Sequence, residues 1–141
     1  MTSIHRSAIV PQSAQRLYAL VADVERYPRL FSWCSDASVV PVDASTVVAR
    51  VGVRLAGLST AFATRNRHVP GERIDMQFEE GPFRSLSGAW TFRALGDSGC
   101  RIGLDLEFEV AGRYLDGAFA SGFQILADRM VDDFVRAAQA G

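Results

Sequence analysis

The pattern of apolar and polar positions changes its period twice along the chain. A strand from Ser3 to Val10 comes first, and residues 14–21 then carry apolar side chains at helical spacing. Ser13 precedes this helix and is a favourable N-cap residue. Residues 23–26 are a candidate second short helix, which we expect Pro28 to end because proline disfavours helix in the residue before it.

From about residue 36 the period changes to two, which is typical of strands. The pattern predicts strands at residues 47–55, 59–68, 74–79, 83–93 and 100–110, several of them separated by turns that contain glycine or proline. The last strand alternates most clearly, with Leu104 and Leu106 on one face and Asp105 on the other. Strands joined by short turns form an antiparallel sheet with one apolar and one polar face.

The period becomes helical again from about Tyr114 to Ala138, where apolar residues recur at spacings of three and four. Much of the remaining surface of this helix carries Asp and Arg side chains, Asp133 among them. The apolar face of the sheet must be covered, and only this helix is long enough to cover it. We therefore predict an α+β fold in one domain, residues 1–141, in which a curved sheet of about six strands wraps round the C-terminal helix.

A curved sheet around a single helix leaves space for a ligand cavity. Trp90 and Phe92 lie on the face that points at the helix, together with Leu86 and Gly88. Gly88 leaves room between the bulky residues and could let the strand bend. The two rings are therefore either ordinary core or the wall of a cavity, and the two interpretations are compatible.

Composition and charge narrow the range of partners. The chain has 141 residues and a net charge of −1, so nothing global attracts DNA or anionic lipid. Cys34 and Cys100 have no paired spacing, which predicts neither a disulfide framework nor a zinc site. The N-terminus lacks the pattern of a signal peptide, and no apolar stretch reaches the roughly 18 residues that span a bilayer. We expect a cytoplasmic protein, at most peripheral to the inner membrane.

Catalytic chemistry is not indicated by the sequence. His5 and His68 are far apart and stand beside no cysteine or carboxylate pair, so each is interpreted as a surface or structural histidine. Cys34 follows Trp33 and is interpreted as a small buried hydrophobe, because only nearby arginines could lower its pKa. We predict a protein that is not an enzyme and requires no cofactor or metal, with an aromatase or cyclase activity left open.

Two features have alternative interpretations. Arg65 and Arg67 share a strand face opposite acidic residues of the next strand, so they either form cross-strand ion pairs or offer a patch to ribosomal RNA phosphates. Gly112, Gly117 and Gly122 lie in or near the long helix, where an interior glycine costs about 1 kcal/mol relative to alanine. They either belong to the entry loop and allow close helix–sheet approach, or weaken a first helical turn that opens the cavity. The gate would then be formed by Phe119 and Phe123.

Four segments resemble one known family in the same order along the chain. They are "RYPRLFSWC" at residues 26–34, "FATRNR" at 62–67, "GPFRSLSGAWTF" at 81–92 and "MVDDFVRAA" at 130–138. The family is the polyketide-cyclase-like group of the START-related, helix-grip (SRPBCC) superfamily. More narrowly, the segments resemble the branch that holds the coenzyme-Q-binding proteins of respiration and the bacterial ribosome association toxin. The chain departs from the family pattern at Ser32 and Ala63.

The resemblance implies a START-like helix-grip fold of six to seven strands, two short helices after the first strand, and a hydrophobic tunnel. Our first hypothesis is that the tunnel binds an apolar ligand, an isoprenoid quinone of the ubiquinone type or another polyprenyl lipid, for delivery to a membrane enzyme of respiration. The expected wall is Phe62, Met76, Phe78, Trp90, Leu104, Leu106, Phe108, Phe119, Phe123 and Met130, with Tyr27, Thr64 and Asn66 at the mouth for a headgroup.

The alternative hypothesis needs a surface and no ligand. A ribosome-associated regulator would block subunit joining by contact with the large ribosomal subunit. The basic side chains to test are Arg50, Arg54, Arg65 and Arg67. The continuous apolar inner face and the absence of a basic surplus favour the first hypothesis.

Overall fold

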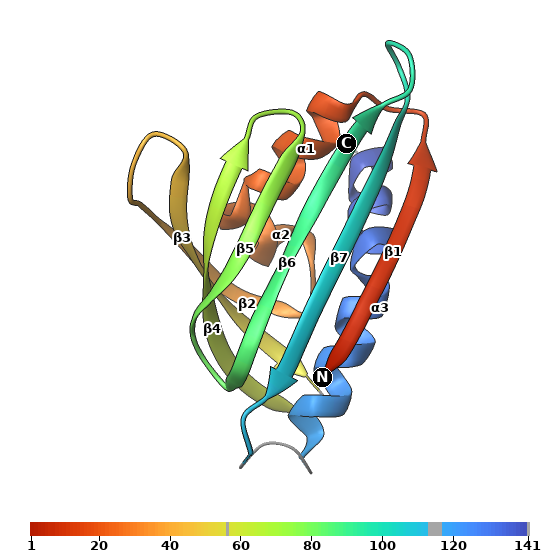
Figure 1. Cartoon of the computed structure of the whole chain (residues 1–141). Helices are drawn as coiled ribbons and strands as arrows, with labels where there is room; N and C mark the ends of the chain where they lie inside the picture. Colours follow the sequence, from red (N-terminus) through yellow and green to blue (C-terminus); the bar gives the residue numbers. More distant parts are fainter. Residues whose placement is uncertain (56, 113–116, 141) are drawn as a thin grey trace.

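Seven antiparallel strands form one sheet in the order β1-β7-β6-β5-β4-β3-β2 (Figure 1). The computed structural model describes residues 1–55, 57–112 and 117–140. Its elements are β1 (Thr2–Val10), α1 (Ala14–Ala22), η1 (Val24–Arg26), α2 (Tyr27–Leu30), β2 (Cys34–Pro41), β3 (Thr46–Leu55), β4 (Leu58–Val69), β5 (Arg73–Glu80), β6 (Phe83–Ala94), β7 (Cys100–Val110) and α3 (Ala118–Ala140). The predicted α+β helix-grip architecture is confirmed.

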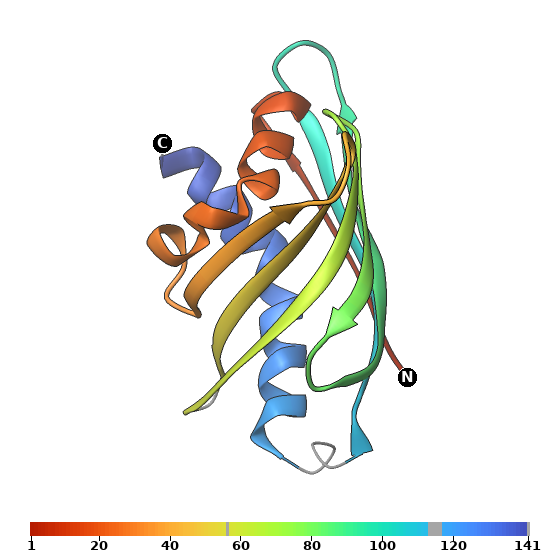
Figure 2. The same cartoon turned by 90° about the vertical axis from the view of Figure 1, so that its left-hand side faces the viewer.

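The sheet curves round α3, which lies along its concave face (Figure 2). Phe119 and Phe134 of α3 are almost fully buried there. The short helices α1 and α2 lie beside the C-terminal half of α3 and close that end of the sheet. The concave face of the sheet, α3 and these short helices therefore enclose one common interior.

The first helix begins as expected, but Pro28 does not end the second short helical segment. The backbone N–H of Arg16 donates to the Ser13 hydroxyl at 3.1 Å, as expected of an N-cap. The segment Val24–Arg26 is a 3₁₀ turn, and α2 follows it directly with Pro28 in its first turn. The expectation was wrong because the first turn of a helix does not need the missing proline N–H.

The long helix α3 begins at Ala118 in the structure. The expected start at Tyr114 falls among residues 113–116, outside the described residues. An added Cβ at Gly122 would lie 2.9 Å from Cβ of Leu55 in β3, so this glycine allows α3 to approach the sheet closely. A Cβ at Gly88 would lie 2.2 Å from the carbonyl oxygen of Asp105, so β6 and β7 also need a glycine there. The opening of the first helical turn stays a prediction.

Aromatic rings fill the interior at both of its ends. In the first group, which we call the Phe83 cluster, Phe62, Phe78, Phe108, Phe119 and Phe123 surround Phe83 with ring centroids 4.9–6.1 Å from it. In the second, the Phe134 cluster, Tyr27, Phe31 and Trp90 lie 4.9–5.3 Å from Phe134, and Trp33 stacks on Phe31. Most of these pairs are edge-to-face, the favoured arrangement of aromatic rings.

Candidate functional site

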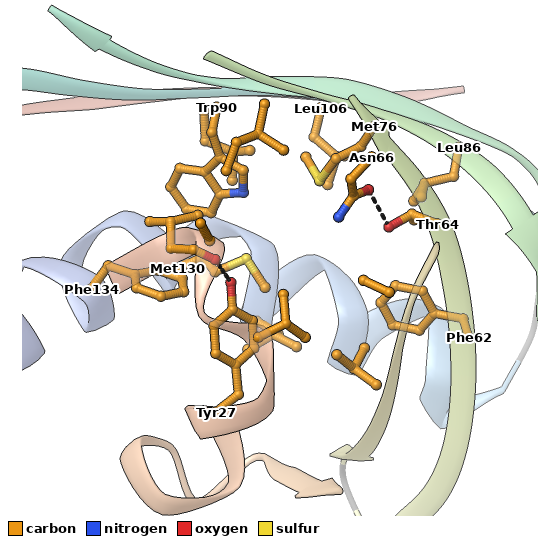
Figure 3. Close-up of a pocket in the computed structure, with 18 of the residues that line it drawn as sticks. Tyr27, Phe62, Thr64, Asn66, Met76, Leu86, Trp90, Leu106, Met130 and Phe134 are labelled. Atoms are coloured by element: carbon orange, nitrogen blue, oxygen red, sulfur yellow. Dashed lines mark hydrogen bonds between the residues drawn. The ribbon is translucent and has the colours of Figure 1, made fainter. Parts of the chain in front are cut away.

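A cavity of about 90 Å³ lies between the two aromatic clusters (Figure 3). It is bounded by the concave face of the sheet, by α3 and by the segment from α1 to the residues just after α2. Its lining residues are Val21, Ala22, Val24, Tyr27, Trp33, Ala49, Val51, Val53, Phe62, Thr64, Asn66, His68, Ile74, Met76, Leu86, Trp90, Leu104, Leu106, Phe123, Leu126, Met130 and Phe134.

Most of the predicted wall lies at this cavity. The predicted residues that line it are Phe62, Met76, Trp90, Leu104, Leu106, Phe123 and Met130. Phe78, Phe108 and Phe119 do not line it, because they pack around Phe83 and fill the end of the interior where α3 begins. Trp90 and Phe92 of the "GPFRSLSGAWTF" segment have different surroundings. Trp90 lines the cavity, whereas the ring of Phe92 packs edge-on against Tyr18 of α1, with 5.6 Å between the ring centroids.

The polar pair Thr64 and Asn66 lies inside the cavity and not at a mouth. Each side chain is 6% exposed. Alternation along β4 places both on the inner face, two residues apart. The hydroxyl of Thr64 donates to Oδ1 of Asn66 at 2.7 Å. The burial departs from the expectation of a headgroup site at the mouth, because the inner face of β4 forms part of the cavity wall.

Tyr27 lines the cavity, but its hydroxyl proton is already used. The hydroxyl donates to the backbone carbonyl of Val21, which links α2 to α1. Burial raises the pKa of Tyr27 well above its usual value, and the nearby Cys34 and Asp23 add to the effect. Tyr27 is therefore a neutral structural group, with its ring in the wall.

His68 is a lining residue that the sequence reasoning interpreted as surface or structural. Its Nδ1 lies 2.9 Å from the hydroxyl of Tyr18 in α1. Burial lowers the pKa of His68 and raises that of Tyr18, so both groups are neutral near pH 7. Alternation along the strand could have indicated its position, because His68 lies on the same inner face of β4 as Thr64 and Asn66.

The segment from Val21 to Trp33 supplies lining residues, of which only Tyr27 was predicted to lie at the site. Tertiary packing lays α1, η1 and α2 over the open side of the cavity. The residues of β3, such as Ala49, could have been found because they alternate like those of β4. The sequence reasoning therefore missed one wall of the site almost completely.

The cavity is smaller than a cavity that is known to hold an aromatic ring. A cavity of about 150 Å³ is known to hold benzene, and this one has about 90 Å³. Met76 and Met130 line it from opposite sides, one on β5 and one on α3, and both are half-buried. Methionine is flexible and fills irregular gaps, so these two side chains are the parts of the wall that can move to admit a ring.

The described lining residues include no Cys, Ser or Lys side chain. Cys34 and Cys100 are buried free thiols. Burial and the Asp36 carboxylate raise the pKa of Cys34 to about 11, which favours the unreactive thiol. Within residues 1–55, 57–112 and 117–140, no group of three or more His, Cys, Asp or Glu side chains is placed to hold a metal ion.

The outer face of the sheet carries the arginines proposed for ribosome contact. Arg65 pairs with Glu79 at 3.1 Å, and Arg50 pairs with Glu80. The contact of Arg65 with Glu79 confirms the cross-strand ion-pair interpretation for Arg65. Arg54 donates to the backbone carbonyl of Ser32 at 3.1 Å. Arg67 forms no ion pair with any residue that the structure describes.

The fold and the apolar cavity together define a helix-grip protein of the class that binds hydrophobic ligands. Residues 10–135 match the family model described as "Polyketide cyclase / dehydrase and lipid transport". The ribosome association toxin RatA of Pseudomonas aeruginosa is 43% identical over 138 residues, which are 98% of this chain and 96% of that one. RatA of Escherichia coli K12 is 38% identical, over 95% of this chain and 85% of the relative. The chain belongs to the polyketide cyclase/dehydrase and lipid transport family, in the branch that contains RatA.

Solved structures agree on the architecture. An 18 kDa protein from Caulobacter crescentus is 29% identical, with a TM-score of 0.75 over 99% of this chain and 97% of that chain. The Zhui aromatase/cyclase from Streptomyces sp. R1128 has a TM-score of 0.81 over 98% of this chain and 93% of that chain. Its identity of 18% supports the fold alone. No helix among the described residues is both long and apolar enough to cross a membrane.

Proposed function

We propose that the protein binds a neutral hydrophobic small molecule in the cavity between the sheet and α3, without chemical conversion. The observation that carries this proposal is the cavity itself, which lies between the sheet and α3 and is lined almost entirely by apolar side chains. Burial of apolar ligand surface there contributes roughly 25 cal/mol per Å². The polar groups of the wall are few and neutral, which suits orientation of a ligand more than catalysis.

An isoprenoid quinone is the first candidate ligand. Its ring would take the place of the Met76 and Met130 side chains after these change rotamer, and its tail would leave through the opening of the cavity. The protein would carry this poorly water-soluble ligand to a membrane enzyme of respiration and would act as its chaperone. In this proposal the quinone is a reversibly bound ligand, and the protein needs no permanently bound cofactor.

The test is to identify the molecule that co-purifies with the protein. The native protein is purified without detergent, and an organic extract is analysed by mass spectrometry. Ala49 is 4% exposed and lines the cavity, so Ala49→Leu fills the cavity with a larger side chain and is the matched control. The proposal is supported if a quinone or another polyprenyl lipid co-purifies with the wild type and not with Ala49→Leu. An empty wild type that also binds no added short-chain quinone contradicts it.

Ribosome association is the second candidate function. It is favoured by the 43% identity to a ribosome association toxin over almost the whole of both chains. In this proposal the protein contacts the large ribosomal subunit through its surface and blocks subunit joining. Arg67 is the best-placed of the candidate arginines, because it projects from the outer face of β4 and forms no ion pair with a described residue.

This second function is tested by co-sedimentation with ribosomal subunits. Arg67→Glu should reduce co-sedimentation and make it less sensitive to salt, since each phosphate contact adds to the salt dependence of RNA binding. Arg93→Glu changes another exposed arginine on the same sheet, on β6, and serves as the control. Equal binding of both variants and the wild type would exclude this surface, and absence of wild-type co-sedimentation would exclude the function.

A further inference from the structure

Asn66 is a buried residue whose side-chain amide has a hydrogen-bond partner at its oxygen and none at its nitrogen among the described residues. Its side chain is 6% exposed and lines the cavity. Oδ1 accepts the hydrogen bond from Thr64, whereas Nδ2 donates to no residue that the structure describes. Figure 3 shows Nδ2 on the side away from Thr64, facing the space between the sheet and Met130. Among the described residues, the fully buried side-chain polar atoms without a partner are Oε1 of Gln12 and Oγ of Ser85. Nδ2 of Asn66 is not one of them, so it is open to the cavity and can meet a ligand there.

Thr64 determines which end of the amide faces the cavity. Its hydroxyl can donate one hydrogen bond, and it donates that bond to Oδ1 of Asn66 at 2.7 Å. The two residues are i and i+2 on one strand face, a spacing that β4 holds rigidly. Thr64 is therefore a positioning residue, which presents the two N–H bonds of Nδ2 to the interior.

The surroundings of Nδ2 indicate what kind of ligand would meet it. Register places Met76 of β5 beside Asn66, and Leu106 and Met130 also line the cavity. These side chains offer no oxygen acceptor. None of the described lining residues is an Asp, Glu or Arg, so a charged ligand would be buried without compensation.

We infer that Asn66 makes the cavity selective for a neutral ligand with a carbonyl oxygen, such as a ketone or a quinone, to which Nδ2 donates a hydrogen bond. This inference rests on the proposed binding of a hydrophobic molecule and adds the chemical feature that is recognised. A site built around a hydrogen bond rejects an analogue that lacks the matching atom, because its own polar group then stays unpaired. The loss of one such bond corresponds to about tenfold in affinity.

The experiment compares two probes of nearly the same shape. Acetophenone carries a C=O group where α-methylstyrene carries C=CH₂, and neither is charged. Binding of each is followed by NMR titration of the ¹⁵N-labelled full chain. The wild type is expected to bind acetophenone about tenfold more tightly than α-methylstyrene. Asn66→Leu should bring the ratio of the two affinities close to one, and Gln77→Leu, the same chemical change at an exposed position of β5, should retain it.

The outcomes separate this inference from the proposed function. Binding of both probes by the wild type with equal affinity overturns the role of Asn66 and leaves a hydrophobic binding site. If the wild type binds neither probe, the proposed function is overturned, and the inference is overturned with it. Thr64→Val provides a second variant if Asn66→Leu does not fold. Loss of the Thr64 hydroxyl frees the Asn66 amide to rotate, so the preference for acetophenone over α-methylstyrene should fall several-fold. An unchanged preference in a folded Thr64→Val protein would contradict the positioning role.

Discussion

The indole Nε1 of Trp33 donates to Oδ2 of Asp133 at 3.3 Å, and both side chains are buried. This hydrogen bond joins the residues just after α2 to the C-terminal half of α3. Asp133 is also paired with Arg136 and lies 3.9 Å from Arg129. The sequence pattern placed Asp133 on the polar surface of the helix. Its burial is a correction, because the segment after α2 folds over that side of α3.

Asp133→Ala should destabilise the protein by about 1–3 kcal/mol, because it leaves the buried Trp33 N–H without an acceptor. The ion pairs with Arg136 and Arg129 add little, since both arginines are largely exposed. Urea unfolding followed by circular dichroism measures the change. The neighbouring Asp132 is exposed, and Asp132→Ala is the control that should alter stability by less than about 0.5 kcal/mol. Equal effects of the two variants would contradict the structural role of Asp133.

Gly122→Ala tests the close approach of α3 to β3. Alanine favours the helix by about 1 kcal/mol. Its Cβ would, however, lie 2.9 Å from Cβ of Leu55, which cannot move without its strand, and overpacking of this kind costs about 1–3 kcal/mol. We expect a net loss of stability in thermal unfolding. At Gly112 an added Cβ meets no atom within 4 Å, so Gly112→Ala is the control without a clash. A more stable Gly122→Ala protein would show that the contact is loose.

Hydrogen exchange distinguishes the two interpretations of the first turn of α3. If this turn opens to admit a ligand, the amides of residues 118–122 should exchange faster than those of residues 126–134. Equal protection in the two segments would favour glycines that serve packing alone. Addition of a bound ligand should slow exchange in the first segment only if that segment forms the entrance.

His68 should make stability depend on pH below neutrality. Burial lowers its pKa in the folded protein, whereas in the unfolded chain the pKa is about 6.5. The unfolded state therefore binds the proton first, and stability is lost as the pH falls through about 6.5 toward the lower folded value. In His68→Gln this part of the pH dependence should be absent from urea unfolding measured between pH 7.5 and 5.

The same shift can be measured directly. The chain has two histidines, so a His5→Gln background leaves His68 as the only imidazole to follow by NMR. Its titration midpoint should lie below 6.5. Loss of the Tyr18 hydroxyl in Tyr18→Phe removes the partner of Nδ1 and should alter the chemical shifts of the ring. A midpoint at or above 6.5 would contradict the burial of His68.

Strong local patterns predicted the fold well. The strand predicted at residues 100–110 has the same bounds as β7, because its alternation of buried and more exposed residues is unbroken and both of its edges pair with a neighbouring strand. Pro28 misled the assignment of α2, since the same residue ends one helix or begins another according to its neighbours. The strand face that lines the cavity was predictable, as Met76 and Trp90 show, whereas Thr64 and Asn66 were expected at the mouth and lie inside the cavity. Trp33 could not be placed at the cavity from the sequence because tertiary packing alone brings its segment there.

The two thiols should be unreactive in the folded protein. Burial and the Asp36 carboxylate raise the pKa of Cys34 to about 11, and burial also raises that of Cys100. At pH 8 the thiolate fraction is small, and the surrounding side chains exclude the reagent. Ellman's reagent should therefore modify neither cysteine in native protein and both after unfolding in urea. Cys34→Ser and Cys100→Ser assign any signal to one thiol. Rapid modification of Cys34 in the native state would mean that the segment after α2 opens readily, and the wall that it contributes to the cavity would then be an entrance.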